Sequence, residues 1–323
     1  MRFIQAWIRA MAVVALFCGG AVQAQPYPSH PIRLIVPFAV GGPSDISARA
    51  LAAGLQQELG QAVIVDNRPG SAAIVGVQAL LGAPADGYTI MMASNIIVTG
   101  KWLYKKLPYD PLKDFRAIAG VSKSPVVVLV PGKSPYKNME DLMQAARARP
   151  GELNYGSAGL GTIPQLANEF FLQKTGLNMK HIPFKGSGQA MPAVMAGQVD
   201  VFFDVALSAQ SQAGNDAIRA IGVVSPSRLA QLPDVPTLAE QGITDFDVAA
   251  WFGLVGRATL PNSVVATLNA AVNKVLATPA FRKQITTLGG VPLGGSPEDF
   301  HKMYVDEYHM WGKVIPAAGL RLD

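Results

Sequence analysis

The sequence predicts an α/β protein of two domains, and three observations support this prediction. Short apolar segments rich in Val and Ile alternate with segments whose apolar residues have helical spacing, which favours largely parallel strands covered by helices. Two strongly β-like segments, 125–131 and 218–224, divide this alternation into two parts. A glycine-rich turn joins a strand to a helix in each part. Two domains joined by two crossings imply a hinge with a cleft between the domains.

The first 24 residues have the pattern of a secretory signal peptide. Arg2 and Arg9 precede an apolar stretch over residues 11–18, and small residues lead to Ala24, after which we expect cleavage. The apolar stretch is short for a transmembrane anchor. A lipoprotein signal would have a small residue before Cys18, where this chain has a phenylalanine. We therefore expect an exported protein.

The composition of the cleaved chain excludes several kinds of protein. The single cysteine leaves with the signal, so the mature chain would have neither disulfide nor thiol chemistry. Lys and Arg fall from 27 to 25 against 22 acidic residues, which lowers the formal net charge from +5 to +3. Basic residues do not cluster with aromatic residues, so we expect no binding to nucleic acid. No later segment is apolar for long enough to span a membrane.

The predicted domain organisation follows the two crossings. The parts are a signal peptide over 1–24, a first domain formed by 25–124 and 225–323, and a second domain over 125–224. In this scheme residues 125–131 are the strand that enters the second domain, and residues 218–224 are the return crossing.

The individual elements of the first part are predicted by their periodicity. Strands are expected over 32–36, 62–65 and 88–93, with helices after the first glycine turn and through Val75 and Leu80. The third strand ends at Ser94 and Asn95, two polar residues at a strand end where open α/β sheets place their ligands. Residues 101–116 predict a turn-rich connection.

The second part and the C-terminal region show the same alternation. The predicted elements are a helix over 139–146, a strand over 199–204, and C-terminal helices over about 264–276 and 297–314.

The first glycine-rich loop follows the strand over 32–36. Gly41 and Gly42 allow a tight turn, and Pro43, Ser44 and Asp45 are typical of a helix start. The free N–H groups at the positive end of a helix dipole favour an anion, a carboxylate as readily as a phosphate. An ordinary connection between a strand and a helix would explain the same residues.

A second loop over 154–162 repeats this arrangement. Its glycines allow close backbone approach, and Ser157 and Thr162 add hydroxyl groups at another helix start. One such loop in each domain could hold one anion from both sides of the cleft; the alternative is that both are plain connections. A third loop over 184–188 contains Lys185, which could lie in the cleft or be solvated.

Residue patterns for other chemistry are not found. Neither loop has the spacing of a dinucleotide or phosphate-binding loop. The four histidines lack the pairing of a zinc site, so we expect no metal and no cofactor. Ser157 and Ser187 could serve as nucleophiles of a secreted hydrolase, but the sequence marks no histidine as their base.

Two aspartates allow more than one interpretation. Asp45 is more typical of a helix start than of a catalytic acid. Asp204 ends an apolar strand, where a carboxylate is unusual. It could receive an ammonium or hydroxyl group of a ligand, or it could cap the turn that follows.

The chain resembles the Bug family of periplasmic solute receptors, the extracytoplasmic binding proteins of tripartite tricarboxylate transport systems. The similar stretches follow one another from the mature start to the end of the chain. They are 27–38, 66–70, 86–88, 107–111, 153–159, 185–187, 197–200 and 232–237.

The resemblance implies a two-domain periplasmic-binding-protein fold of type II (a Venus flytrap) without catalytic activity. It implies a protein of the periplasm that captures a small carboxylate ligand and delivers it to the membrane components of a tripartite tricarboxylate transporter; we expect a monomer. In such receptors the two glycine loops hold one ligand carboxylate, largely through backbone groups and bridging waters. Carried over residue by residue, the implied ligand-binding residues are Phe38, Ala39, Gly41, Gly42, Asp45, Ser94, Ser157, Ala158, Gly159, Thr162, Lys185, Gly186, Ser187 and Asp204.

This chain departs from the usual family pattern in three places. Pro43-Ser44 replaces the usual small residue and threonine, and Gln165 stands where a histidine is frequent. Val205 and Leu207 replace the usual asparagine and proline, which makes the far side of the cleft more apolar. We therefore expect a monocarboxylate or an aromatic carboxylate rather than a citrate-like ligand. A receptor that serves a sensor instead of a transporter would fit the same residues.

Overall fold

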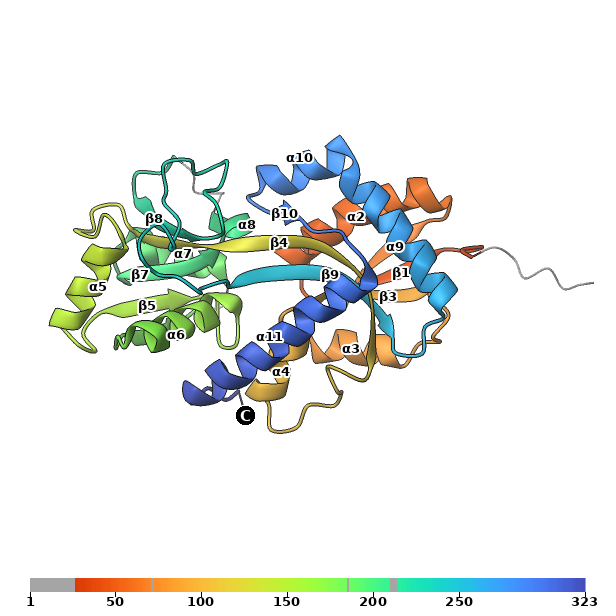
Figure 1. Cartoon of the computed structure of the whole chain (residues 1–323), viewed down its shortest axis with the longest axis horizontal. Helices are drawn as coiled ribbons and strands as arrows, with labels where there is room; N and C mark the ends of the chain where they lie inside the picture. The colour runs from red at the N-terminus through yellow and green to blue at the C-terminus, as the bar shows by residue number, and fades with distance from the viewer. Residues whose placement is uncertain (1–26, 71–72, 185, 210–213, 323) are drawn as a thin grey trace, which may run out of the picture.

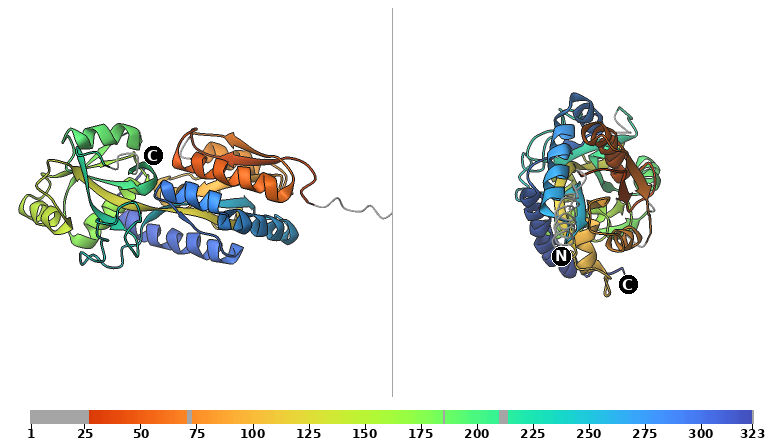
Figure 2. Two further views of the ribbon diagram at one scale, coloured as in Figure 1. Left: turned by 90° about the horizontal axis from the view of Figure 1, so that it is seen from above. Right: turned by 90° about the vertical axis from the view of Figure 1, so that its right-hand side faces the viewer.

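The computed structural model describes residues 27–70, 73–184, 186–209 and 214–322. The predicted signal peptide lies outside these residues. Figure 1 shows an elongated molecule of two α/β halves, connected by strands that run through its centre. Seen from above and from one end in Figure 2, helices cover the sheet on more than one side. The predicted two-domain α/β fold is confirmed.

Ten strands form one mixed sheet within the described residues. The order along the sheet is β2-β1-β3-β9-β4-β7-β5-β6, and β8 and β10 also pair with β4. Pairing is parallel among β2, β1 and β3 and among β6, β5 and β7, as the sequence predicts. The strands are β1 (Ile32–Val36), β2 (Val63–Asn67), β3 (Thr89–Ser94), β4 (Phe115–Pro131), β5 (Asn154–Ser157), β6 (Lys180–Pro183), β7 (Val201–Val205), β8 (Ile218–Val224), β9 (Ala249–Arg257) and β10 (Val291–Pro292).

The helices cover both halves of this sheet. They are α2 (Pro43–Leu59), α3 (Ile74–Leu81), α4 (Ile96–Leu103), α5 (Met139–Ala148), α6 (Ile163–Thr175), α7 (Ser187–Met195), α8 (Ala206–Ala209), α9 (Asn262–Ala277), α10 (Pro279–Thr287) and α11 (Pro297–Ala317). In the described part of the chain no single helix has the length and apolar composition to cross a membrane. Helices α9 and α10, bent by 71° at their junction, pass that test only when they are taken together.

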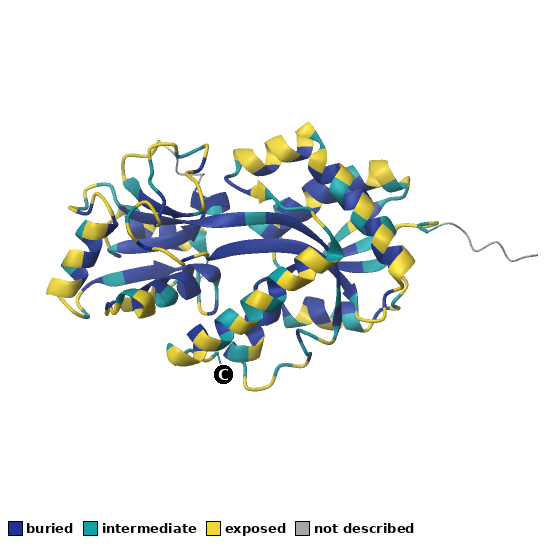
Figure 3. Cartoon of the chain, viewed as in Figure 1, coloured by how far each residue is buried: buried dark blue, intermediate teal, exposed yellow. Residues whose placement is uncertain are grey.

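Strand β4 belongs to both halves of the molecule. Its residues 115–125 pair antiparallel with β9, and its residues 126–131 pair antiparallel with β7 and β8. The strand is 17 residues long and buried over most of its length. Figure 3 shows β4 and β9 as two dark, buried bands between the half-exposed helices. The Val-rich run in β4 suits a strand that is covered on both faces.

The predicted return crossing at residues 218–224 is wrong. These residues form β8, which pairs with the 126–131 part of β4 and therefore stays in the second half. The chain returns further along, and β9 pairs with β4 from Ala249, opposite Pro125, to Arg257, opposite Phe115. Two apolar strands of similar composition cannot be told apart by periodicity, because their pairing partner is distant in sequence. The domain limits at 124/125 and 224/225 remain predictions.

The connection predicted over 101–116 is also more ordered than its turn-rich sequence indicates. Helix α4 extends to Leu103, and β4 already begins at Phe115. The second strand reaches Asn67 instead of ending at Val65, because Asp66 and Asn67 continue the pairing with β1. The other predicted elements lie close to their observed positions.

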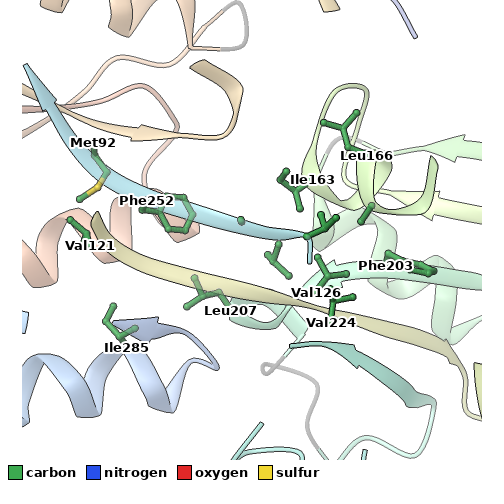
Figure 4. Close-up of a cluster of buried hydrophobic side chains, with 14 of the residues drawn as sticks. Met92, Val121, Val126, Ile163, Leu166, Phe203, Leu207, Val224, Phe252 and Ile285 are labelled. Atoms are coloured by element: carbon green, nitrogen blue, oxygen red, sulfur yellow. The ribbon is translucent and has the colours of Figure 1, made fainter. Parts of the chain in front are cut away.

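The apolar core continues from one half into the other. Figure 4 shows Met92, Val121 and Phe252 on the first-half side of a cluster that also contains Val126 and Phe203. Leu207 and Val224 extend the same cluster. Burial of apolar surface contributes about 25 cal/mol of stability per Å². Because the core is continuous, this burial stabilises the crossing between the halves as well as each half.

A polar network holds the start of β9, at Ala249 and Trp251. Asn95 Nδ2 donates to the carbonyl of Ala249 at 3.1 Å and to Glu307 Oε2 at 2.7 Å. Asn95 Oδ1 accepts from the N–H of Trp251 at 3.0 Å, and Trp311 Nε1 donates to Glu307 at 3.2 Å. Burial raises the pKa of Glu307 to about 7, against the effect of its hydrogen bonds. The network ties α11 and the end of β3 to β9.

We predict that Gly253→Ala lowers the free energy of unfolding by about 1–3 kcal/mol, because an added methyl group would overlap the ring of Phe300 on α11. Urea denaturation measures the change.

Gly120→Ala is the matched control, since Gly120 lies opposite Gly253 on β4. A Cβ at Gly120 would meet Leu293 Cβ at 3.2 Å and Phe300 Cδ2 at 3.6 Å, so this substitution should cost less. Equal costs for the two variants would contradict the packing described.

Candidate functional site

The first glycine loop connects β1 to α2, and the side chain of Asp45 fixes its shape. Gly41 has a φ of +84°, which favours glycine, and its N–H donates to Asp45 Oδ2 at 2.9 Å. Asp45 is the third residue of α2, and its side chain reaches back past the N-cap residue Gly42 to the N–H of Gly41. Asn67 Nδ2 and Arg49 Nε donate to the same carboxylate, each at 2.9 Å.

These donors keep the Asp45 carboxylate ionised, and both of its oxygens accept hydrogen bonds within the loop region. Burial alone would raise its pKa, but the hydrogen bonds from Arg49, Gly41 and Asn67 hold the pKa below its usual value. Asn67 also donates to the carbonyl of Phe38 at 3.1 Å. Asn67 lies beyond the strand that the sequence predicts over 62–65, and its contacts with the loop depend on the pairing of β2 beside β1.

The second glycine loop closes in the same way. Gly161 has a φ of +73°, and its N–H donates to Gln165 Oε1 at 2.6 Å. Gln165 is the third residue of α6, the position that Asp45 has in α2. Thr162, at the residue before α6, donates its hydroxyl hydrogen to the carbonyl of Gly159 at 2.6 Å. Both loops are therefore closed by a side chain four residues after a glycine with positive φ.

The residue before each of these glycines is an exposed apolar one. The side chain of Val40 precedes Gly41 and is 70% exposed, and that of Leu160 precedes Gly161 and is 54% exposed. Large apolar side chains exposed at a loop tip are candidates for contact with another surface.

Ser157 is held by His181, and no local sequence pattern indicates this contact. His181 Nε2 lies 2.7 Å from Ser157 Oγ, and Gln165 Nε2 lies 3.4 Å from His181 Nδ1. Because Gln165 Oε1 already accepts from Gly161, its amide nitrogen faces the ring as a donor, so Nδ1 accepts and Nε2 carries the hydrogen. His181 therefore donates to Ser157. Burial lowers the pKa of His181, which favours the neutral ring.

The first and third loops line one cleft of about 290 Å³ between the halves. Its lining residues are Gly41, Pro43, Ile46, Ser187, Gly188, Met191, Pro192, Met195, Leu207 and Ser208. The N–H of Gly186 donates to the carbonyl of Ala158 at 3.0 Å, which places the second loop beside the third. The apolar lining of α7 was missed, because methionines at helical spacing look like core residues.

The predicted site residues are therefore brought together in part. Gly41 and Ser187 line the cleft, while Ser157, Gly159 and Thr162 belong to the hydrogen-bond network of the second loop. Phe38, Ala39, Gly42 and Asp45 form the first loop, and Ser94 is buried at the end of β3. Lys185 lies outside the described residues. Within the described residues no group of three or more His, Cys, Asp or Glu side chains could hold a metal ion. Contact of these residues with a ligand remains a prediction.

Asp204 lies fully buried behind the wall of the cleft. It accepts hydrogen bonds from Ser187 Oγ at 2.7 Å, Ser208 Oγ at 2.7 Å and the N–H of Val205 at 2.8 Å. Burial raises its pKa to about 6, although these three bonds act to lower it. Of the two roles that the sequence left open, the structure shows the second, because Asp204 accepts from Val205 and Ser208 in the turn that follows. Contact of Asp204 with a ligand remains a prediction.

Comparison with known proteins gives consistent matches. Residues 47–320 match the family model described as "Tripartite tricarboxylate transporter family receptor". The chain is 36% identical over 296 residues to the UPF0065 protein in the tcbD-tcbE intergenic region of Pseudomonas sp. (strain P51), covering 91% of this chain and 88% of that protein. It is 32% identical over 323 residues to Protein BugT of Bordetella pertussis, covering 97% and 98%. The solved structure of R. palustris Rpa4515 with adipate is 31% identical, with a TM-score of 0.82 and coverage of 92% and 100%.

We predict that Asp204→Asn changes the pH dependence of stability. A carboxylate whose pKa rises from 3.8 to about 6 on folding binds its proton more tightly in the folded state, so the wild type loses stability as pH rises from about 4 to above 6. The variant lacks this loss. Its stability relative to wild type should increase by up to about 3 kcal/mol between pH 4 and pH 7.5.

Urea denaturation of both proteins across this pH range measures the difference. The contributions of His181 and Glu307 are present in both proteins and cancel. A difference that does not vary with pH would show that Asp204 is not held in the environment described.

Proposed function

The chain belongs to the tripartite tricarboxylate transporter receptor family, whose members are periplasmic solute-binding receptors, and from this premise we propose its function. It captures a small carboxylate ligand in the cleft between its two halves and delivers it to the membrane components of a transporter of that type. In this proposal the signal peptide is removed after Ala24, and the mature protein acts as a monomer in the periplasm.

One observation carries the proposal: two loops of the same construction stand at the starts of α2 and α6. The N–H groups of a first helical turn have no partners inside the helix and carry the positive end of its dipole. In both loops the closing side chain, Asp45 or Gln165, points back to the glycine N–H. The remaining N–H groups at these two helix starts are suited to an anion such as a carboxylate.

The charge of Asp45 does not argue against an anion in the first loop. Arg49 Nε lies 2.9 Å from its carboxylate and compensates the negative charge locally. Gln165 performs the same closure in the second loop with a neutral side chain. Neither loop therefore presents a net negative charge from its closing residue.

Closure of the two halves completes the site in this proposal. Val40 and Leu160 are exposed at the tips of the two loops, where closure around a ligand would cover them. The halves share strand β4, so a small bend in that strand is sufficient to change the width of the cleft.

A secreted hydrolase acting through Ser157 is the second candidate, and the 2.7 Å contact with His181 favours it. A general base must accept the hydrogen of the nucleophile. Gln165 holds His181 in the opposite tautomer, in which the ring donates to Ser157. The other candidate nucleophile, Ser187, donates to Asp204 at 2.7 Å rather than to a histidine. We therefore favour a receptor without catalytic activity; ester hydrolysis that Ser157→Ala abolishes would restore the hydrolase. A receptor that serves a sensor would use the same site.

We predict that at least one carboxylate stabilises the mature protein, residues 25–323, against thermal unfolding. The panel consists of monocarboxylates, dicarboxylates, tricarboxylates, amino acids and aromatic acids. A ligand at about 100 times its dissociation constant adds about 2.7 kcal/mol of stability, because it binds only the folded state. Mass spectrometry of the unfolded protein detects a ligand that has co-purified. If no carboxylate binds and none co-purifies, the proposal is wrong.

Gln165→Ala tests the role of the loops with the same assay. Without the bond to Gly161 the second loop is less ordered, and we expect the affinity for the stabilising carboxylate to fall about tenfold. The matched control is Gln144→Ala, which removes an exposed glutamine bonded to Glu140 on α5. The control should bind as the wild type does; an equal loss in both variants would contradict a specific role of the loop.

A further inference from the structure

The serines at the far side of the cleft share one buried carboxylate. Resting on the proposed carboxylate receptor, we propose that Ser187, with Asp204 and Ser208 behind it, forms a second ligand subsite that accepts a hydrogen bond. The preferred ligand then carries a hydroxyl or amino group at the end opposite its carboxylate, with an apolar body between them. A second carboxylate at that end is disfavoured.

The direction of the hydrogen bonds in the cluster follows from the number of hydrogens. A serine hydroxyl has one hydrogen and two lone pairs, whereas an ionised carboxylate can only accept. Ser187 donates to Asp204 Oδ1 and Ser208 donates to Asp204 Oδ2, both at 2.7 Å. The carbonyl of Val205 lies at 3.0 Å from Ser208 Oγ, a longer alternative for the same hydrogen. Ser187 therefore presents only lone pairs to the cleft, and its partner in a ligand must be a donor.

The charge of the cluster gives the same preference. Ser187 is the first residue of α7, so the positive end of that helix already has a negative partner in Asp204. A second carboxylate at that end would lie beside the buried carboxylate of Asp204, an arrangement that repulsion and desolvation both oppose.

Apolar side chains make up most of the rest of the cleft lining. Met191 and Met195 lie one turn apart on α7, and Ile46 of α2 and Leu207 of α8 line the same cleft. Flexible methionine side chains adapt to aliphatic and aromatic surfaces alike. The body of the ligand is therefore apolar, and its polar groups are confined to the two ends.

Two matched ligand series test the subsite by isothermal titration of the wild-type mature protein at pH 7.5. The first series is 4-hydroxybenzoate, 4-aminobenzoate, 4-methoxybenzoate, benzoate and terephthalate. The second is 6-hydroxyhexanoate, hexanoate and adipate, the last being the ligand with which Rpa4515 was solved. In at least one series we expect the ligand with a donor to bind about three- to tenfold more tightly than its partner without one. The dicarboxylate should bind most weakly.

Asp204→Asn gives the test within the protein. The amide oxygen stays at the Oδ1 position, because it must accept from the N–H of Val205, so Ser187 still donates to it and the amide nitrogen donates to Ser208. Loss of the negative charge should raise the affinity of terephthalate or adipate relative to the hydroxy acid, while the preference of Ser187 for a donor over the unsubstituted ligand remains. Ser187→Ala should remove the preference without favouring the dicarboxylate. Ser263→Ala, an exposed position on α9, is the control that should retain the wild-type order.

The outcomes separate this inference from the proposed function. If carboxylates bind the wild type but the hydroxy acid is no tighter than its methoxy or unsubstituted partner, the acceptor subsite is wrong and the receptor stands. Tighter binding of a dicarboxylate than of the hydroxy acid likewise overturns the subsite alone. If no carboxylate binds in these series or in the larger panel, both fail. The wild-type measurements decide the question even if a variant does not fold.

Discussion

Strand β4 is the constraint on which both halves of the molecule depend. Its first eleven residues are hydrogen-bonded to β9, and its last six are bonded to β7 and β8. A continuous strand transmits the register of one half to the other, so the two halves cannot slide along each other without breaking ladder hydrogen bonds. The remaining freedom is a bend or twist of the strand. The network of Asn95 and Glu307 ties β9 to the end of β3 and to α11, which further restricts the first half.

The two glycine loops apply a local form of constraint. Each is shaped by a hydrogen bond from a glycine N–H to a side chain in the first turn of the following helix. Such a bond forms between residues close in sequence, so the loop is largely ordered by its own helix. Contacts between residues further apart in sequence come from neighbouring strands: Asn67 bonds to the first loop and His181 to the second. These contacts hold each loop to its sheet.

Features that depend on nearby residues could be predicted from the sequence, and those that depend on distant pairing could not. Gly41, Pro43 and Asp45 indicate a turn and a helix start because each acts within a few residues. The return crossing was assigned to residues 218–224, which form β8, instead of β9, since both are apolar strands whose paired residues in β4 lie about 90 to 140 residues away. The contact of His181 with Ser157 joins adjacent parallel strands, and no local signal reveals it.

The construction of the loops has a consequence for how receptors of this kind diversify. The residues that shape the loops, such as Asp45 and Gln165, are different from the residues that line the middle of the cleft, such as Met191 and Leu207. In the proposed site, a substitution in the second group changes which solute fits the cleft, while the loops shaped by the first group still present the same N–H groups to its carboxylate. The choice of nutrient can therefore change through few substitutions that leave the order of the two loops intact.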